Sequence, residues 1–464
     1  MTAAAARLGL WSRTARAPIP LDTTDVDVEL VDLCSQVELR QHYTNRETAV
    51  IEAVYTFPLP VDAVLLSLHI RLGGRELAGV VQPRRRARDD YEDAVTDGHT
   101  AMLLEQLEEG LYSLSLGNLG PGEHAEIRLR FALLHRFDGD QVRWRLPTVI
   151  GPRFGRAPHP DDQVPEAQID VAHGLHFRMR IRGLLGRARI ASPSHAVEVR
   201  RHDDHTEVCL SKGGWLDRDV VLTFDLPGGE RLGASADADL EEGATVLASF
   251  CPQLPIDAPE TARGRAITLL VDCSGSMGGV SIAQAKRALQ QILATVRPRD
   301  RIALVRFGSS IDDVVGAPVS PDSLKMRELH AAVELLDADL GGTELFPALR
   351  HALSLAPDEM PADIILITDG QVWDRNGQIA SILALAAERG QRIFAVGVGS
   401  AVSERQVRAL AEGTGGACTM VSPGEQMAPA IQRQFERLFA PRARQVCIDW
   451  PAAPSWAQVP QTLF

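Results

Sequence analysis

The sequence predicts two regions of different fold class, a strand-rich N-terminal region of antiparallel β-sandwich type followed by a doubly wound α/β domain. Short alternating segments separated by turn residues recur over the first half of the chain. A continuous apolar strand, Ala266–Val271, is followed by a helix-periodic segment, Ser281–Val296. Strands and helices then alternate up to Phe439, and a chain of 464 residues is too long for one core.

Alternation of apolar and polar residues predicts the strands of the first region. After an Ala- and Arg-rich tail, residues 1–20, we expect strands at Val26–Val31, Gln36–Gln41, Ala49–Phe57, Val64–Leu72, Glu76–Val81 and Leu111–Leu116. One helix, Arg84–Asp97, interrupts them, and Gly98 is suited to end it. Hairpin-like strands around a single helix favour an antiparallel sandwich.

A linker rich in Pro and Asp, Gly155–Ala167, precedes a second set of expected strands. These are His176–Ile181, Arg187–Ile190, Ala196–Arg200, Thr206–Leu210, Val220–Leu226 and Thr245–Phe250. We expect them to complete the β-layer begun by the first region. The segment His202–His205 holds two His and two Asp residues, but it lies between two strands and has no third ligand at a suitable spacing, so it predicts a hairpin tip.

The α/β domain follows a second linker, Asp257–Arg265. Its expected strands after Ala266–Val271 are Asp300–Phe307, Ile364–Thr368 and Arg392–Val398, and its expected helices are Asp322–Leu336, Glu344–Leu353, Ile379–Glu388, Glu404–Ala411 and Gln426–Phe439. Gly397 and Gly399 lack the third glycine of a dinucleotide loop. A last alternating segment, Arg444–Trp450, would make the α/β domain an insertion if it paired with the N-terminal β-layer.

Oxygen-bearing side chains follow two of the apolar strands. Asp272, Ser274 and Ser276 are spaced by two residues, so in an extended segment they point the same way. Thr343 opens a helix, and Asp369 ends a second apolar strand. Carboxylates and hydroxyls are hard donors that suit Mg²⁺ or Mn²⁺, and ligands bind at the carboxyl ends of strands in such sheets. The alternative is that these residues only cap helices.

The set Asp272-x-Ser274-x-Ser276, Thr343 and Asp369-Gly370 resembles the metal-ion-dependent adhesion site (MIDAS) of von Willebrand factor A domains. The type, order and spacing of these residues match the family pattern. The resemblance implies that the serines and the threonine bind the metal, that the aspartates bind it directly or through water, and that a partner's carboxylate completes the coordination sphere.

Residues 21–154 resemble the vault protein inter-alpha-trypsin (VIT) domain. The residues that carry this resemblance are Tyr43-x-Asn45, Glu52-Ala53-x-Tyr55-x-Phe57-Pro58-Leu59-Pro60, Tyr91-x-x-Ala94, Gly98, Leu103-Leu104-Glu105-Gln106, Gly117-Asn118-Leu119-x-Pro121-Gly122 and Arg145-Leu146-Pro147. Family members commonly place this domain before an A domain, as in inter-alpha-trypsin inhibitor heavy chains. The proline that usually follows the asparagine is absent, because Arg46 follows Asn45.

Several polar residues of the VIT-like region have both a structural and a functional interpretation. Glu52, Glu105 and Asn118 stand in apolar blocks, where buried polar groups usually form hydrogen bonds that fix turns. The run Arg84–Arg88 could bind phosphate or an acidic partner, but a solvated helix face followed by acidic residues is the favoured interpretation.

Composition narrows the class of partner. The formal charge of -13 and the pI near 5.5 argue against nucleic acid and against anionic membranes. No apolar run is long enough for a membrane helix, and residues 1–18 lack a signal-peptide core. The six scattered cysteines indicate reduced, mostly buried thiols. These features predict a cytoplasmic protein.

Two classes of function remain. The first is a non-enzymatic scaffold that binds a partner's Asp or Glu carboxylate through Mg²⁺ or Mn²⁺. The second is a hydrolase with its nucleophile near Ser276, which is disfavoured because the last histidine, His351, precedes Asp369. The expected segments are 1–20 as a tail, 21–154 as the VIT domain, 155–262 as a β-rich continuation, 263–440 as the A domain and 441–464 as a C-terminal β segment. The sequence predicts neither the partner's identity nor the oligomeric state.

Overall fold

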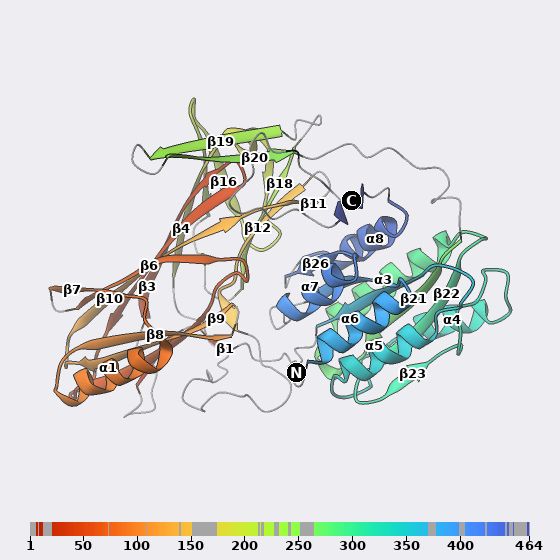
Figure 1. Ribbon diagram of the computed structural model, residues 1–464, viewed down its shortest axis with the longest axis horizontal. Helices are drawn as coiled ribbons and strands as arrows, with labels where there is room; N and C mark the ends of the chain where they lie inside the picture. Colours follow the sequence, from red (N-terminus) through yellow and green to blue (C-terminus); the bar gives the residue numbers. More distant parts are fainter. Residues whose placement is uncertain are drawn as a thin grey trace. The chain divides into compact units, whose positions relative to one another are not determined.

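The chain divides into two compact units, one that extends from the N-terminus to Cys251 and one from Pro252 to the C-terminus (Figure 1). The computed structural model describes residues 6–7, 9–12, 21–72, 74–108, 110–138, 141–150, 174–211, 214, 218–226, 232–239, 243–250, 264–369, 377–398, 404–422, 425–440, 443–444, 449 and 462–463. The expected linker Gly155–Ala167 lies outside these residues.

The N-terminal unit is organised around an eight-stranded sheet. Its order is β16 (Val197–Arg201), β17 (Thr206–Leu210), β14 (Leu175–Arg182), β3 (Leu21–Val31), β4 (Cys34–Thr44), β10 (His124–Leu134), β6 (Val64–Leu72) and β7 (Arg75–Ala78). Neighbours are antiparallel, except that β14 pairs with β3 in parallel. Of the strands expected after the linker, β14, β16 and β17 extend this first layer, through a parallel pair that the predicted antiparallel sandwich did not include, whereas the others belong to different sheets.

Two four-stranded sheets complete the N-terminal unit. One has the order β2 (Gly9–Ser12), β5 (Ile51–Pro58), β9 (Leu111–Leu119) and β8 (Ala101–Glu108), and the other β11 (Phe137–Asp138), β12 (Gln141–Leu146), β18 (Val220–Asp225) and β15 (Arg189–Ala191). Smaller pairs join β1 (Ala6–Arg7) to β13 (Val149–Ile150) and β19 (Leu232–Asp239) to β20 (Gly243–Phe250). The remaining elements are helix α1 (Arg84–Thr96) and a 3-10 turn, η2 (Gly183–Arg187).

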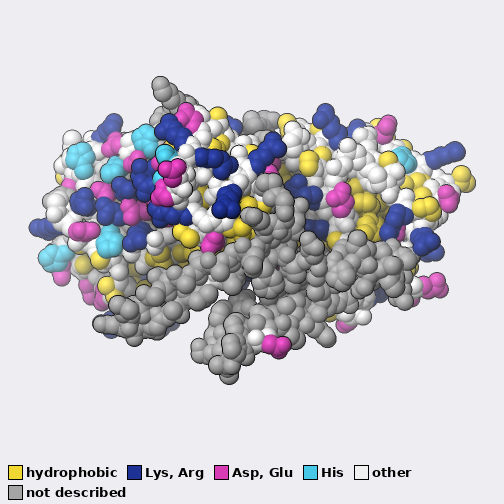
Figure 2. All heavy atoms as spheres, turned by 90° about the horizontal axis from the view of Figure 1, so that it is seen from above, with side chains coloured by type: hydrophobic (Ala, Val, Ile, Leu, Met, Phe, Trp, Pro, Cys, Tyr) yellow, Lys and Arg dark blue, Asp and Glu magenta, His cyan; other side chains and the backbone are white. Residues whose placement is uncertain are grey.

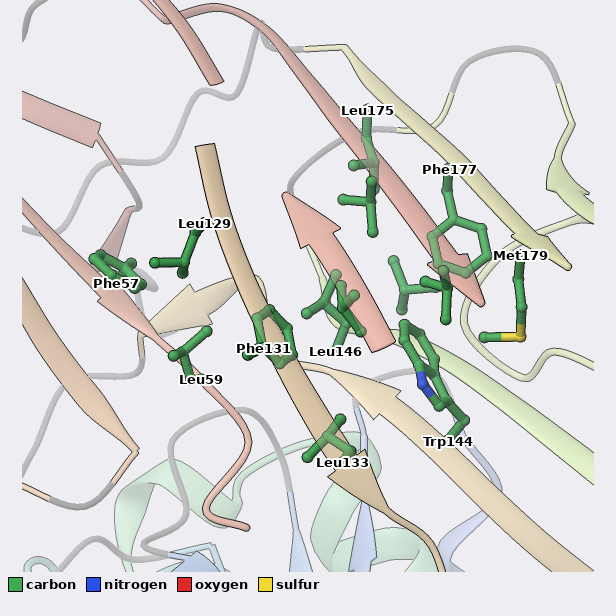
Figure 3. Packing of buried hydrophobic residues seen from close by; sticks show 14 of the residues in the cluster. Phe57, Leu59, Leu129, Phe131, Leu133, Trp144, Leu146, Leu175, Phe177 and Met179 are labelled. Carbon is green, nitrogen blue, oxygen red and sulfur yellow. The ribbon is translucent and has the colours of Figure 1, made fainter. Parts of the chain in front are cut away.

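One hydrophobic core joins the eight-stranded sheet to both four-stranded sheets. Figure 3 shows this packing, with Phe57 of β5, Phe131 of β10 and Trp144 of β12 among the buried side chains. The Trp144 ring lies 5.4 Å from the ring of Phe177 on β14, centroid to centroid. Strand β10 alternates buried and half-exposed residues along its length, which is the pattern of a sheet with one covered face.

The polar residues of the apolar blocks have structural roles around α1, as predicted. Glu52 accepts a hydrogen bond of 2.9 Å from the Tyr91 hydroxyl. Asn118 has a positive φ of 58° and donates to two carbonyl oxygens at the end of the helix. Buried Glu105 accepts from Arg84 and Arg88 at 3.0 and 2.7 Å, so two arginines of the expected solvated face are instead held by a carboxylate.

The outer face of the eight-stranded sheet is covered by cross-strand ion pairs. Asp27 on β3 lies 2.6 Å from Arg178 on β14 and 2.8 Å from Arg40 on β4. Basic, acidic and histidine side chains lie side by side over this unit in Figure 2. A balanced pattern of this kind keeps a broad sheet face soluble without giving it one sign of charge.

The C-terminal unit is a six-stranded sheet flanked by helices. The order is β23 (Ile311–Asp313), β22 (Arg301–Phe307), β21 (Ala266–Asp272), β24 (Ala362–Thr368), β25 (Arg392–Val398) and β26 (Cys418–Val421), with β23 alone antiparallel to its neighbour. The helices are α3 (Val280–Thr295), α4 (Met326–Glu334), α5 (Leu345–Ser354), α6 (Gln378–Glu388), α7 (Glu404–Gly413) and α8 (Met427–Arg437). Separate hydrophobic clusters cover the two faces of the sheet, which confirms the doubly wound α/β class.

A few expectations need correction. Helix α4 begins at Met326 and not at Asp322, and the short edge strand β26 was not predicted. Strand β27 (Ala443–Arg444) pairs with β28 (Thr462–Leu463). Most of the expected segment Arg444–Trp450 lies outside the described residues, so its pairing with the N-terminal β-layer stays a prediction. The thiols are less buried than expected, because Cys34 is exposed.

Candidate metal centre

The candidate site lies at the carboxyl edge of the six-stranded sheet, where the strand order reverses. Strand β21 is buried along its whole length and pairs in parallel with β22 on one side and β24 on the other. Chain connections leave β21 and β24 in opposite directions, which opens a crevice at the strand ends. Asp272 ends β21 and Asp369 follows β24, so the topology brings both aspartates to this crevice.

Asp272 is fully buried and held by neighbouring donors. Its Oδ1 accepts a 2.9 Å hydrogen bond from the backbone N–H of Ser274, and its Oδ2 accepts one of 2.6 Å from the Thr368 hydroxyl. Cys273, the residue between them, is buried away from this cluster beside Arg306, and burial raises the pKa of its thiol to about 11. The side chain of Cys273 thus points away from those of Asp272 and Ser274, as their spacing predicts.

The two serines connect Asp272 to the second aspartate. The Ser274 and Ser276 hydroxyl oxygens lie 3.1 Å apart, and the Ser276 hydroxyl donates a 2.9 Å hydrogen bond to Oδ1 of Asp369. Ser274 is buried, whereas Ser276 is exposed. Hydrogen-bond-length contacts thus connect four of the five predicted residues, with the Asp272–Ser274 link made by the backbone N–H of Ser274.

The carboxyl group of Asp369 carries an electrostatic cost in this arrangement. Burial, and then the neighbouring charge of Asp272, raise its pKa to about 7, although the hydrogen bond from Ser276 opposes the shift. The ion pairs between described residues include none to Asp369. A cation between the two carboxylates would remove the repulsion, so the donor set fits a hard divalent ion.

Thr343 belongs to a separate loop that backbone hydrogen bonds fasten to the first one. The N–H of Gly275 donates to the carbonyl of Gly341 at 2.9 Å, and Gly341 has the positive φ of 78° that favours glycine. The Thr343 side chain is 5% exposed, and within the described part of the chain its hydroxyl makes no hydrogen bond. A threonine that is nearly buried while its hydroxyl oxygen has no protein partner is a candidate ligand.

Sequence reasoning missed two residues that support the site. Thr368 holds Asp272, and Ser309 accepts a 2.7 Å hydrogen bond from the N–H of Gly342, beside Thr343. Both are hydroxyl residues at or just after the carboxyl ends of strands, and their position at the same sheet edge was the only signal available. The neighbouring Gly308 has no room for a side chain, because a Cβ there would lie 2.4 Å from the Cβ of Leu340.

Other acidic and histidine residues of the A domain lie away from this site or outside the described residues. Asp300 and Asp363 pair with arginines at the opposite edge of the sheet. Asp374 and Gly370 lie outside the described residues. His351 lies 2.9 Å from Asp313, so its ring is oriented toward that carboxylate. The segment His202–His205 joins the antiparallel strands β16 and β17, and the N–H of His202 donates to the carbonyl of His205 at 2.8 Å, which confirms the predicted hairpin tip.

Family comparisons agree with the order of the two regions. The family model of the vault protein inter-alpha-trypsin domain matches residues 21–131, and that of the von Willebrand factor type A domain matches residues 266–434. Human von Willebrand factor A domain-containing protein 5A is 26% identical over 95% of this chain, and the match covers 59% of that protein. A von Willebrand factor A domain-containing protein of Dictyostelium discoideum is 25% identical over 92% of this chain and 45% of its own length.

Another relative carries the name of an enzyme. The human protein mono-ADP-ribosyltransferase PARP4 is 25% identical over 99% of this chain, but the match covers only 27% of that protein. The chain therefore spans between about a quarter and three fifths of these relatives.

Solved structures show a weaker likeness. A von Willebrand factor type A protein from Catenulispora acidiphila is 19% identical, with a TM-score of 0.35 over 47% of this chain and 48% of that one. Proximal thread matrix protein 1 from the mussel byssus, described with a zinc-occupied MIDAS motif, is 18% identical with a TM-score of 0.33 over 40% of this chain and 48% of that one. At these scores neither likeness indicates what this chain binds.

The described helices include none that is long and apolar enough to cross a membrane. The sheet-rich N-terminal unit, the six-stranded sheet with its flanking helices, and the two family matches agree with one another. This chain is a protein that carries a vault protein inter-alpha-trypsin domain followed by a von Willebrand factor type A domain.

Proposed function

We propose that the chain is a non-enzymatic scaffold that holds a divalent metal at the carboxyl edge of its A domain and uses it to capture a carboxylate of a partner protein. The residues proposed to hold the metal are Asp272, Ser274, Ser276, Thr343 and Asp369. Mg²⁺ or Mn²⁺ is proposed because all the donors are oxygen atoms. When bound, the metal would supply positive charge and an open coordination position for an acidic side chain.

The observation that carries this proposal is the state of Thr343 and Asp369. The Thr343 side chain is only 5% exposed and its hydroxyl has no hydrogen-bond partner among the described residues, and Asp369 is half-buried beside the fully buried carboxylate of Asp272. A group that only capped a helix would use its oxygen for a backbone N–H. Helix α5 has no side-chain cap hydrogen bond at its start, which argues against the capping alternative for Thr343.

The protein's own residues would organise the site before the metal arrives. Thr368 and the N–H of Ser274 orient the Asp272 carboxylate, and the Ser276 hydroxyl orients that of Asp369. Ser309 fixes the loop that carries Thr343. Ligands already held near their binding positions lose little conformational freedom on binding, which favours affinity.

The class and location of the protein are part of the proposal. A non-enzymatic role is favoured because the hydrolase alternative lacks a base, since His351 faces Asp313. A cytoplasmic location is proposed from the scattered cysteines, and the four described cysteines form no disulfide with one another. The order of the two domains supports a relation to inter-alpha-trypsin inhibitor heavy chains.

The test is calorimetric titration of Mg²⁺ and Mn²⁺ into chelator-treated protein. The parent is expected to bind one ion saturably, and Thr343→Ala is expected to bind it at least tenfold more weakly because one neutral ligand is lost. Ser310→Ala is the matched control, since Ser310 is an exposed serine of the same sheet edge that makes no side-chain hydrogen bond with the described residues.

Two outcomes would contradict the proposal. Equal metal affinity in the parent and in Thr343→Ala would exclude Thr343 as a ligand. Absence of binding in the parent, with both ions and at millimolar concentration, would leave the capping interpretation as the better account.

A further inference from the structure

The loops around the candidate metal centre are strongly acidic. Segments 308–314 and 337–344 contain Asp312, Asp313, Asp337, Asp339 and Glu344, and no Lys or Arg. These segments follow β22 and precede α5, so they lie at the same sheet edge as the site. An excess of acidic residues at this edge agrees with the preference of helix N-termini for negative charge. The same negative charge also repels an approaching carboxylate.

The acidic loops contact the loop that carries the metal ligands. A Cβ placed on Gly278 would lie 4.0 Å from the Cβ of Ala338, which stands between Asp337 and Asp339. Glu344 directly follows Thr343 in the chain and is exposed. A ligand that reached the metal would therefore pass within a short distance of these carboxylates.

The basic residue that ends the neighbouring strand does not offset this charge. The Arg306 side chain is only 15% exposed, and it is already paired with Asp312 at 3.1 Å and with Asp339. Asp313 is engaged by His351. Asp337 and Glu344 take part in none of the ion pairs between described residues. These two segments, 308–314 and 337–344, form the described rim of the site. The rim thus presents uncompensated negative charge to a ligand.

The opposite edge of the same sheet shows that the charge is not a property of the whole unit. The segment 296–301, between α3 and β22, carries Arg297, Arg299 and Arg301 against one acidic residue, Asp300. Arg265 and Arg392 lie at the same edge. Asp358, Glu359 and Asp363 also lie at this edge, so its charge is mixed, whereas segments 308–314 and 337–344 at the candidate metal centre hold only acidic charged residues.

We infer that the partner presents its metal-binding carboxylate from a basic segment, with Lys or Arg within a few residues of the Asp or Glu. This inference rests on the proposed function and narrows the class of partner. The metal attracts one carboxylate at short range, whereas the rim acts over roughly 10 Å at 0.1 M salt. A carboxylate with acidic neighbours can still bind the metal, but the acidic loops repel its neighbours. A carboxylate with basic neighbours is attracted by the metal and by the acidic loops.

The test uses three labelled seven-residue peptides and the full-length protein in saturating Mn²⁺. One peptide has a central Asp flanked by lysines, the second has the same Asp flanked by serines, and the third has Asn in place of Asp between the lysines. At low salt we expect the lysine-flanked Asp peptide to bind on the order of tenfold more tightly than either of the others, with the advantage over the serine peptide falling as salt is added.

A variant with fewer acidic residues in the rim distinguishes the effect of the rim charge from the effect of the metal. Asp337→Asn/Glu344→Gln should reduce the preference for lysine over serine flanks while Mn²⁺ binding continues. Asp358→Asn/Glu359→Gln, which removes two exposed carboxylates between α5 and β24, should leave the preference unchanged.

The remaining outcomes are distinguishable. Absence of Mn²⁺ binding would overturn the proposed function itself. With Mn²⁺ bound, equal affinity for lysine-flanked and serine-flanked peptides, equal affinity for the Asp and Asn peptides, or no binding of any peptide at millimolar concentration would overturn the inference about the partner.

Discussion

Each edge of the A-domain sheet holds a carboxylate that is largely removed from water, fully buried Asp363 at one edge and half-buried Asp369 at the other, and the two are compensated in different ways. At the amino edge, Asp363 is fully buried and accepts hydrogen bonds from Arg392 at 2.7 and 2.9 Å and from Arg265 at 2.5 Å. At the carboxyl edge, Asp369 is held by the hydroxyl of Ser276 and faces Asp272. At the amino edge, arginines of the same chain neutralise the carboxylate. At the carboxyl edge, no described residue forms an ion pair with Asp369, so a metal ion from solution would have to neutralise it.

The comparison teaches how a structural ion-pair cluster differs from a binding site on one scaffold. A buried carboxylate that serves the fold is surrounded by donors from its own chain, because an uncompensated buried charge is costly. A carboxylate that serves binding remains partly uncompensated in the free protein, which costs free energy. Binding of a cation removes that cost. The predictions below therefore treat stability at one edge and metal response at the other as separable properties.

The largest expected effect comes from breaking the amino-edge cluster. Asp363→Asn leaves two buried guanidinium groups without their carboxylate, so we expect a loss of about 3–5 kcal/mol in the free energy of unfolding. The measurement is denaturant unfolding of the full chain, and the loss should be the same with chelator and with Mn²⁺. Asp358→Asn, an exposed residue before the same strand, should change stability by less than about 0.5 kcal/mol. A loss below about 1 kcal/mol in Asp363→Asn would show that the cluster does not carry this stability.

A half-buried histidine in the N-terminal unit, His135, extends the comparison to a group without a strong counter-charge. His135 lies 2.7 Å from the hydroxyl of Ser35, which also accepts from Trp144 at 3.3 Å. Burial lowers the His135 pKa to about 4, against which the charge of Asp62 acts weakly. The hydroxyl proton of Ser35 is then free to bond the neutral ring nitrogen.

This lowered pKa predicts a loss of stability in acid. The unfolded state takes up a proton near its ordinary pKa of about 6.5, before the folded state does, so stability falls as the pH drops from about 6.5 toward 4. At pH 5 the loss from His135 is at most about 2 kcal/mol, since the side chain keeps some exposure. Denaturant unfolding at pH 7 and pH 5 should show a smaller acid loss in His135→Gln than in the parent, and an equal loss would contradict the assignment.

The smallest expected effect concerns the support of the carboxyl edge. Ser309→Ala removes the hydrogen bond to the N–H of Gly342, which is worth about 1 kcal/mol, so Mn²⁺ affinity should fall about fivefold. Ser309→Thr should restore most of it, and Ser310→Ala should leave it unchanged. A fall in thermal stability with no change in Mn²⁺ affinity would mean that Ser309 supports the loop but not the site.

Much of the fold and the site could be predicted from local sequence patterns. Continuous apolar runs such as β21 and β24 predict buried parallel strands. The spacing of two residues between Asp272, Ser274 and Ser276 predicts that their side chains point the same way in an extended segment. Strand β10 alternates as regularly as any predicted strand, so its pattern was sufficient although it was not assigned. The four-residue strand β26 was too short for a periodic signal.

Other features depend on contacts between distant segments, which local patterns do not encode. The parallel pairing of β14 with β3 joins residues that lie about 150 positions apart, and nothing in either strand specifies its partner. Arg265, Asp363 and Arg392 meet only because three strands begin at one edge. Thr368 and Ser309 likewise acquire their roles from the arrangement of strand ends, since a lone hydroxyl residue has many ordinary uses.

The measurement that tests the central claim most directly is the stability of Asp369→Asn relative to the parent, determined with chelator and again with Mn²⁺. With chelator, Asp369→Asn should be equal to the parent or more stable by about 1 kcal/mol, because the repulsion from Asp272 is removed. With Mn²⁺ at about 100 times its dissociation constant, the parent should gain about 2.7 kcal/mol and the variant should gain little, so the order of stability reverses. A variant that is less stable than the parent with chelator, and that responds to Mn²⁺ as the parent does, would contradict the claim that the carboxyl edge is built for a metal.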